Sequence, residues 1–338
     1  KVSCHTLVPP AWKTVKATTR VLPLLPLLLS GWFAVPAHAD EARDWIKRLG
    51  QAEQQQSYQG TFVYERNGSF STHSIWHLVQ DGSVRERLLQ LDGPAQEVVR
   101  TNGRTECVTG KLVSGLAGVS ASAVRKLDAD KISNWYSVAK SGDSRVAGRP
   151  VAIISLTPRD QHRYGVELYL DNQTGLPLKS LLLNDKGQLL ERFQFTELDP
   201  HAPEVTLLNP GAQCRQIAAL EPKDLVVKHV NNWHSDWLPP GFELVNSTVH
   251  RDPKSKSEVT SLLYDDGLTR FSVFLEPLNG ASAPDTRVQL GPTAAVSRHL
   301  TTNNGDMLAT VVGEIPIGTA ERIALNMRPG QASTQAKP

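Results

Sequence analysis

The residues that most suggest chemistry lie in the run Trp233-His234-Ser235-Asp236-Trp237. Serine, histidine and aspartate together suggest acyl transfer, in which the histidine activates a serine nucleophile and the acid orients the histidine. Three such groups adjacent in sequence do not form this relay, because they must converge in space from separately oriented backbone positions. The sequence also lacks the common nucleophile-elbow, phosphate-loop, dinucleotide-binding and zinc-protease motifs. We therefore predict that the protein is not an enzyme, with a hydrolase of dispersed site as one alternative.

A second candidate for chemistry is the pair His73 and His77, which could bind a metal. Residues four apart on a β-strand lie on the same face, and imidazole is a common metal ligand. The sequence offers no obvious third ligand beside them. We therefore interpret both as surface histidines, and we predict neither a metal site nor a cofactor.

Residues 1–39 have the order of a secretory signal peptide. Lys13, Lys16 and Arg20 precede an apolar run over residues 21–35, and Ala37-His38-Ala39 then matches a small-x-small cleavage site. The apolar run is too short for a good membrane span. The residue after the cleavage site is not cysteine, so we expect no lipid anchor. These features predict a signal peptide with an upstream extension, and a soluble protein exported to the periplasm.

Composition and charge argue for an ordinary globular protein without a nucleic-acid partner. The 338 residues are 40% hydrophobic and 21% charged, and this length allows two domains. The formal net charge of +2 includes four basic residues and no acid in 1–39, so the exported part carries −2. A nearly neutral chain gives no electrostatic case for nucleic acid.

Two cysteines remain after residue 39, Cys107 and Cys214. An exported protein reaches a compartment in which disulfides persist. A bridge between them would close a loop of about a hundred residues and contribute at most about 4.7 kcal/mol. Two separate buried thiols are the alternative.

Ser57 to Leu91 is the stretch around which the chain is organised. Period-two alternation, interrupted at Asn67-Gly68 and Asp81-Gly82, predicts three antiparallel strands with one buried face. A helix over residues 40–56 precedes these strands. Further strands are expected over 97–112, with Asn102-Gly103 as the turn, and a short helix is expected to end near Trp135-Tyr136.

A second run of strands is expected over residues 163–198, with Phe193 and Phe195 on one face. Beyond it, a smaller segment contains strands at 243–250, 259–264, 270–275 and 309–314, a short helix at 293–299 and a closing helix at 319–326. The predicted domains are the signal peptide 1–39, a large domain 40–205, a linker 206–224, a small α+β domain 225–328 and a disordered tail 329–338.

Curved antiparallel sheets with a helix can enclose a space, and five aromatic residues and one leucine in the two runs are candidates to line it. These residues are Phe62, Tyr64, Trp76, Leu78, Phe193 and Phe195. Each methylene that moves from water into such a site gains about 0.8 kcal/mol, so a long acyl chain could bind without charge chemistry. The alternative is a core filled by these side chains.

Several short motifs follow one another along the chain. They are the opening helix with Tyr58-Gln59-Gly60-Thr61-Phe62-Val63-Tyr64, then Ser74-Ile75-Trp76-His77-Leu78, Asp81-Gly82 with Arg85-Glu86-Arg87, Thr174-Gly175-Leu176-Pro177-Leu178, Trp237-Leu238-Pro239-Pro240-Gly241-Phe242, and Val311-Val312-Gly313-Glu314-Ile315-Pro316 with Thr319-Ala320-Glu321-Arg322-Ile323-Ala324. Their order resembles the MucB/RseB family, most closely its pseudomonad branch. The match runs over nearly all of the chain after residue 39.

This resemblance implies a fold of class α+β, with a LolA/LolB-like curved, open antiparallel β-barrel with helices in the large domain. It implies a periplasmic negative regulator of the extracytoplasmic-stress sigma factor, sigma-E or AlgU, the factor that governs alginate regulation in pseudomonads. Such proteins bind the periplasmic domain of a membrane anti-sigma factor of the MucA or RseA type and protect it from site-1 proteolysis. They release it on binding mislocalised lipid such as lipopolysaccharide, and the small domain contacts the partner.

The main alternative is a periplasmic lipid or lipoprotein carrier without a regulatory partner, because the large domain alone would have the same sequence pattern. The residues that contact the partner are not assigned from the sequence, and homo-oligomerisation stays open.

Overall fold

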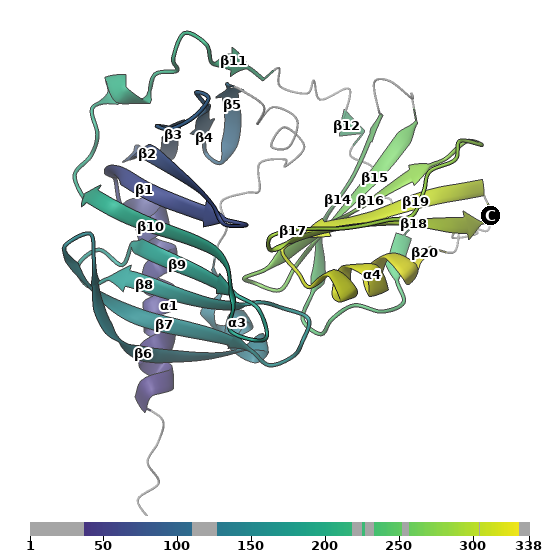
Figure 1. Ribbon diagram of the computed structural model, residues 1–338, viewed down its shortest axis with the longest axis horizontal. Helices are drawn as coiled ribbons and strands as arrows, with labels where there is room; N and C mark the ends of the chain where they lie inside the picture. The colour runs from purple at the N-terminus through teal and green to yellow at the C-terminus, as the bar shows by residue number, and fades with distance from the viewer. Residues whose placement is uncertain are drawn as a thin grey trace, which may run out of the picture. The chain divides into compact units, whose positions relative to one another are not determined.

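The computed structural model describes residues 37–109, 127–217, 225–226, 233–251, 257–303 and 305–330 (Figure 1). The signal-peptide prediction lies almost wholly outside these residues, as does the disordered tail. The helices are α1 (Ala37–Gln55), α3 (Ala129–Trp135) and α4 (Ile317–Leu325), with the 3-10 helix η2 (Val205–Leu208). None of the described helices combines the length and apolar content needed to cross a membrane.

The first sheet has eleven strands, each antiparallel to its neighbours. In spatial order they are β11 (Arg215–Gln216), β5 (Arg104–Val108), β4 (Glu97–Thr101), β3 (Ser83–Gln90), β2 (Ser69–Gln80), β1 (Tyr58–Arg66), β10 (Leu189–Asp199), β9 (Pro177–Leu183), β8 (Gly165–Asp171), β7 (Arg149–Pro158) and β6 (Tyr136–Val146). The order ends at β11 on one side and β6 on the other, so the predicted open antiparallel sheet is confirmed. Figure 1 shows its strands curving around α1.

Local turn chemistry sets the hairpins of this sheet. Asn67-Gly68, Asp81-Gly82 and Asn102-Gly103 each form a two-residue loop, and all six residues have positive φ between 51° and 75°. Positive φ at both central residues is the geometry of the type I′ turn, whose twist matches that of paired strands. The hairpins predicted from these dipeptides are therefore confirmed.

The helices cover the first sheet through the apolar stripe that the sequence predicts. Trp45, Ile46 and Leu49 of α1 are buried in one cluster with Ile132 of α3 and Tyr136 of β6. Helix α3 begins after Asp128, whose carboxylate accepts hydrogen bonds from the backbone N–H groups of Asp130 and Lys131. The short helix predicted near Trp135 is thus confirmed.

The second sheet has seven strands and is covered on one face by α4. In spatial order its strands are β12 (Leu225–Val226), β14 (Glu243–Arg251), β15 (Glu258–Asp265), β16 (Arg270–Pro277), β19 (Gly305–Gly313), β18 (Thr293–Thr302) and β17 (Thr286–Leu290). A separate pair joins β13 (Trp233–Ser235) to β20 (Met327–Pro329). Ala320, Ile323 and Ala324 of α4 are fully buried against the sheet in a cluster that includes Phe271.

The helix predicted over residues 293–299 is wrong, because these residues belong to β18. The neighbouring alanines suggested a helix, but Ala294 and Val296 alternate into the core while β18 pairs with β19 along its whole length. Tertiary pairing here overrides the weak local preference of alanine. Strands β6 and β17 were not predicted at all.

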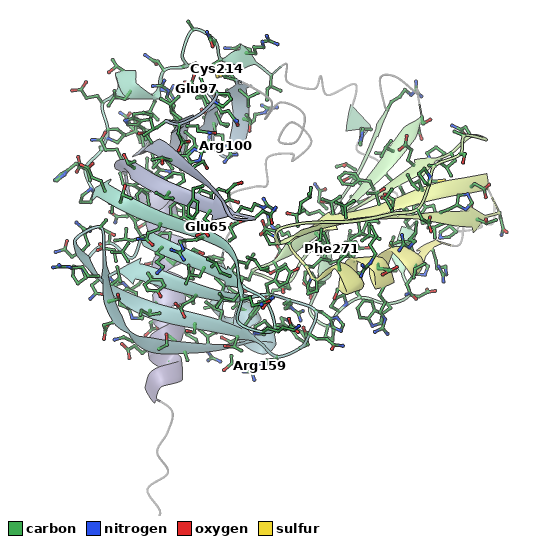
Figure 2. The ribbon with its side chains drawn as sticks, in the orientation of Figure 1. Glu65, Glu97, Arg100, Arg159, Cys214 and Phe271 are labelled. Carbon is green, nitrogen blue, oxygen red and sulfur yellow. A yellow bond between two sulfur atoms is a disulfide. The ribbon has the colours of Figure 1, made fainter. Side chains whose placement is uncertain are left out.

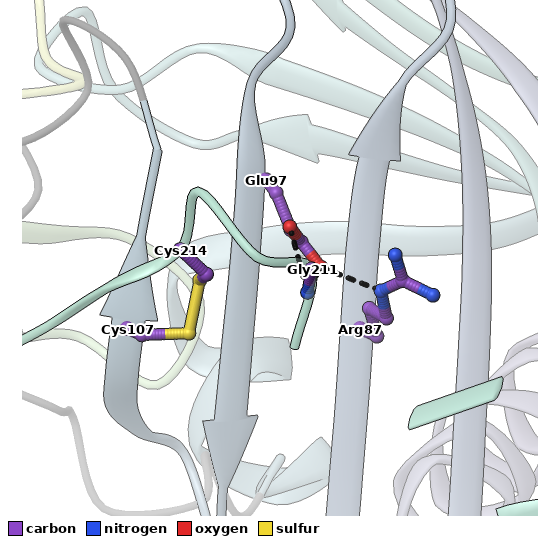
Figure 3. The surroundings of a disulfide bond; sticks show 5 residues. All are labelled: Arg87, Glu97, Cys107, Gly211 and Cys214. Atoms are coloured by element: carbon purple, nitrogen blue, oxygen red, sulfur yellow. Dashed lines mark hydrogen bonds and ion pairs between the residues drawn. A yellow bond between two sulfur atoms is a disulfide. The ribbon is translucent and has the colours of Figure 1, made fainter. Parts of the chain in front are cut away.

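Residues 205–214 lie against the face of the first sheet that carries Arg87, Glu97 and Cys107. Cys214 forms the disulfide with Cys107, which decides the open question in favour of the bridge (Figure 3). Beside it the buried Glu97 carboxylate lies 2.6 Å from Arg87 Nε and accepts the Gly211 N–H at 3.0 Å. Residues 206–214 of the predicted linker therefore pack on the sheet and 215–217 pair with β5 at its edge, whereas 218–224 lie outside the described residues.

Replacing Cys107 and Cys214 together by serine should lower the free energy of unfolding by about 2–4 kcal/mol, because the bridge restricts the unfolded chain across a long loop. Denaturant titration of the exported part of the chain, with and without the double substitution, measures this change. Thiol titration of the unfolded wild-type protein is the control. An unchanged unfolding midpoint would show that the bridge does not contribute to stability in this way.

Candidate functional site

Four of the six predicted lining residues meet on one face of the first sheet. Phe62 of β1 is paired with Phe195 of β10, and Tyr64 with Phe193. The ring centroids of Phe62 lie 4.7 Å from Phe193 and 5.8 Å from Phe195. We call this face, with the aromatic residues Phe62, Tyr64, Phe193 and Phe195, the inner face. Phe62 and Phe195 belong to the same cluster as Ala52 of α1.

A glycine allows this aromatic packing. Gly60 lies two residues before Phe62 and on the same face, next to the ring of Phe195. A Cβ atom at position 60 would lie 2.9 Å from Phe195 Cε1 and 2.3 Å from the carbonyl oxygen of Glu197. No side chain fits there, so Gly60 is needed for the close approach of β10.

The other two predicted lining residues, Trp76 and Leu78, lie on the opposite face. Trp76 is paired with Gln59 rather than with an inner-face residue, and the Arg87 guanidinium lies 5.1 Å from its ring centroid. The alternation within β2 does not show which half of its residues shares a face with Phe62, because a one-residue change of register between β1 and β2 exchanges the two faces. The prediction that Trp76 and Leu78 line one space with the other four residues is therefore wrong. Lipid binding by the inner face stays a prediction.

The residues of β2 that do join the inner face include His73, Ile75 and His77. His73 stacks on Phe62 with 5.1 Å between ring centroids, and His77 stacks on Tyr58 at 4.7 Å. His77 is only 4% exposed, so its interpretation as a surface histidine is wrong. Burial lowers the pKa of His73. Within the described residues, no three His, Cys, Asp or Glu side chains are grouped to hold a metal ion.

A polar row crosses the inner face beside the aromatic residues. His77 is paired with Glu86 of β3, which is paired in turn with Arg100 of β4, labelled in Figure 2. His77 Nδ1 lies 2.9 Å from Glu86 Oε1, while the buried His77 Nε2 has no hydrogen-bond partner. Burial alone would raise the pKa of Glu86, but the hydrogen bond and charge of His77 and the charge of Arg100 outweigh it and lower this pKa.

The inner face therefore combines apolar rings with a charged row. This combination suits the binding of an amphiphilic ligand better than catalysis. The run proposed for acyl transfer supports this view. Ser235 Oγ donates to the Trp237 carbonyl oxygen at 2.6 Å, whereas His234 lies 3.2 Å from Asp236. The hydroxyl is bonded to the backbone and not to the histidine, so the three residues form no relay.

Replacing Glu86 by glutamine should cost about 1–2 kcal/mol of stability at pH 7, since the acceptor of the His77 hydrogen bond loses its charge. The pKa of Glu86 is lower in the folded state than in the unfolded state, so its carboxylate stabilises the folded protein at pH values above the unfolded pKa, near 4.3. This contribution is lost as the pH falls through the folded-state pKa. The difference from wild type should therefore shrink in acid. Denaturant titration at several pH values tests this, with the exposed Glu106→Gln as control, and a pH-independent difference would contradict it.

A buried ion pair that sequence reasoning missed joins two loops. Arg163, in the loop between β7 and β8, is 2% exposed, and its Nε lies 2.6 Å from Asp266 Oδ2 in the loop between β15 and β16. The Tyr136 hydroxyl donates to the same oxygen at 3.2 Å, and burial raises the pKa of this tyrosine. The Arg163 guanidinium also lies 4.8 Å from the Phe242 ring centroid. The only sequence feature that pointed to this region was Asp265-Asp266-Gly267, a common turn sequence.

Replacing Arg163 by methionine should cost about 3–5 kcal/mol, because it leaves the Asp266 carboxylate buried without its charge partner. Arg159→Met is the matched control, since this arginine is exposed four residues earlier in the same loop (Figure 2). The control should change stability by less than about 0.5 kcal/mol. Equal unfolding midpoints for the two variants would contradict the assigned role of the pair.

Taken together, the chain is a two-sheet α+β protein built on an open antiparallel sheet with an aromatic and polar inner face. Family models for the MucB/RseB N-terminal domain and the MucB/RseB C-terminal domain match residues 41–220 and 227–328. The chain belongs to the MucB/RseB family.

Named relatives and solved structures agree with this assignment. The chain is 56% identical over 310 residues to the sigma factor AlgU regulatory protein MucB of Pseudomonas aeruginosa, covering 91% of this chain and 97% of the relative. It is 28% identical to the sigma-E factor regulatory protein RseB of Escherichia coli K12, covering 85% and 90%. A solved complex of P. aeruginosa MucA and MucB matches with a TM-score of 0.75 and 56% identity, covering 86% of this chain and all of that chain.

Proposed function

We propose that the protein is a periplasmic negative regulator of an extracytoplasmic-stress sigma factor. In this role it binds the periplasmic domain of an anti-sigma factor of the MucA or RseA type and protects it from site-1 proteolysis. The observation that carries the proposal is the 56% identity, over most of both chains, to a relative named as a regulator of the sigma factor AlgU. MucB has also been solved in complex with the periplasmic domain of MucA.

Within this proposal the two sheets have separate roles. The small domain, predicted as residues 225–328, binds the anti-sigma factor. The large domain, predicted as 40–205 with a LolA/LolB-like fold, binds mislocalised lipid such as lipopolysaccharide on its inner face. The partly buried Phe193 supplies apolar surface there, beside the buried rings of Phe62 and Phe195, and burial of acyl methylenes against it is worth about 0.8 kcal/mol each.

The polar row lies beside the aromatic residues, so the inner face has a polar side and an apolar side. Arg100 is a cation suited to an anionic lipid headgroup, and the unpartnered His77 Nε2 can bond a hydroxyl or amide group. The binding of lipid and the binding of the anti-sigma factor are then thermodynamically linked. Lipid must favour the partner-free state by a few kcal/mol to shift the population appreciably.

Periplasmic location is supported by the leader and by the disulfide. The order of basic residues, apolar run and small-residue site in 1–39 is that of an export signal. The Cys107–Cys214 bridge fits an oxidising compartment such as the periplasm.

Substituting Phe193 by aspartate should abolish the release of the partner by lipid while sparing partner binding, because a carboxylate opposes acyl burial on the inner face. Calorimetric titration of the exported protein with the MucA periplasmic domain, with and without lipopolysaccharide, measures both properties. Phe70→Asp is the matched control, since Phe70 is 64% exposed and lies outside the inner face.

Two outcomes would contradict parts of this proposal. Loss of folding in Phe193→Asp, seen as a lost thermal transition, would show that the ring belongs to a filled core rather than to a lipid site. Failure of the wild-type protein to form a stable complex with the MucA periplasmic domain would favour the lipid carrier without a regulatory partner.

A further inference from the structure

Strand β17 forms one end of the second sheet and pairs only with β18. All five of its residues, Thr286 to Leu290, are exposed. The pairing with β18 runs without a register shift from Thr286 opposite Ser297 to Leu290 opposite Thr293. β17 is therefore an edge strand without a register shift (Figure 1), and at its last residue the Leu290 carbonyl oxygen accepts a hydrogen bond from Arg66 at 3.2 Å.

Other sheet ends in the described ranges carry features that discourage strand pairing. β11 and β12 have two residues each, and β13 and β20 have three. β6 is long, but its register shifts between Lys140 and Gly142, and Lys140 pairs with Glu41 and Asp143. Short length, bulges and charged side chains are the usual protections of an edge strand. β17 contains no Lys, Pro or bulge, and Pro284 and Pro292 lie just beyond its two ends.

The turn fixes which backbone groups of β17 point outward. Gly291-Pro292 is a two-residue loop with Gly291 at φ +60°, the pattern of a type II′ hairpin, which closes on a hydrogen-bonded pair. Residues bonded to the partner strand alternate with residues whose N–H and C=O point away. Counting back from Leu290, the outward residues are Gln289 and Arg287.

The side chains of β17 define what an added strand would meet. Arg287 lies on the α4 side and pairs with Glu321 at 3.1 Å. Val288 and Leu290 lie on the opposite face and are 44% and 58% exposed. Val288 continues an apolar row through its pairing partner Ala295 to Val312 of β19. A strand that places apolar side chains beside Val288 and Leu290 would extend this row.

The dimensions of β17 favour a peptide segment over a second copy of the chain. Five residues give a ladder of about 17 Å. Stable protein dimers bury on the order of 1,600 Å², far more than one short strand supplies. An extended segment of a partner that is also held elsewhere needs only the backbone bonds and the two apolar contacts that β17 offers.

We propose that β17 binds an extended segment of the anti-sigma factor as an additional antiparallel strand, with alternate apolar side chains placed beside Val288 and Leu290. This inference rests on the proposed function, because it assigns a contact to the same partner. Arg287 and Gln289 supply the backbone groups that bond the segment.

A proline at position 287 tests the added strand. Arg287→Pro removes an outward N–H while leaving the pairing with β18 intact, which an edge strand tolerates. Arg287→Ala is the matched control, because both variants lose the pair with Glu321 and only the proline loses the N–H. The proline variant should bind the MucA periplasmic domain about tenfold more weakly than the alanine variant. Thermal melting of both variants confirms that they fold.

Amide hydrogen exchange on the wild-type protein gives a second measurement that needs no substitution. The amides of Arg287 and Gln289 should exchange rapidly alone and become protected with the MucA periplasmic domain. Equal binding by the two folded variants, with no new protection, overturns the added strand but leaves the proposed function intact. Protection that appears without partner and grows with protein concentration assigns the edge to a second copy and also overturns it. Absence of wild-type binding overturns the proposed function itself.

Discussion

The strict alternation of side chains across the first sheet is the constraint on which the rest of this structure depends. Each strand from β1 to β4 sends neighbouring residues to opposite faces, so one register decides the content of both. Pairing of Phe62 with His73 and Phe195 collects rings and histidines on the inner face. The same register sends Trp76 and Arg87 to the other face, where residues 205–214 cover the sheet. The inner face and the covered face are thus fixed together.

The covered face illustrates how a buried charge is kept in a β-sheet protein. Glu97 is 6% exposed, and an isolated carboxylate at that depth would be costly. Arg87 supplies the opposite charge, the Gly211 N–H supplies a second donor, and Arg87 also donates to the Leu207 carbonyl oxygen. The disulfide lies beside this group and holds the covering segment where those donors are needed. Charge satisfaction and covalent closure therefore support the same contact.

Local features of the sequence predicted local structure well, and the failures are non-local. Asn67-Gly68 and Asp81-Gly82 predict their own turns, because positive φ is a property of those residues. The face occupied by Trp76 depends on pairing with β1, which alternation within β2 does not determine. The helix predicted at β18 is wrong because the local preference of its alanines is weaker than the pairing with β19. Arg163 and Asp266 are about a hundred residues apart, and nothing near either one identifies the other.

The Arg163–Asp266 pair is better understood as a source of specificity than of stability. Removing two charges from water is costly, and apolar residues of similar size often give equal or greater stability. The arrangement is satisfied only when Arg163 Nε reaches Asp266 and Tyr136 donates to the same carboxylate. A shifted contact between these loops would leave a charge buried without a partner. Such states are unfavourable, so the pair favours this one contact between the two loops.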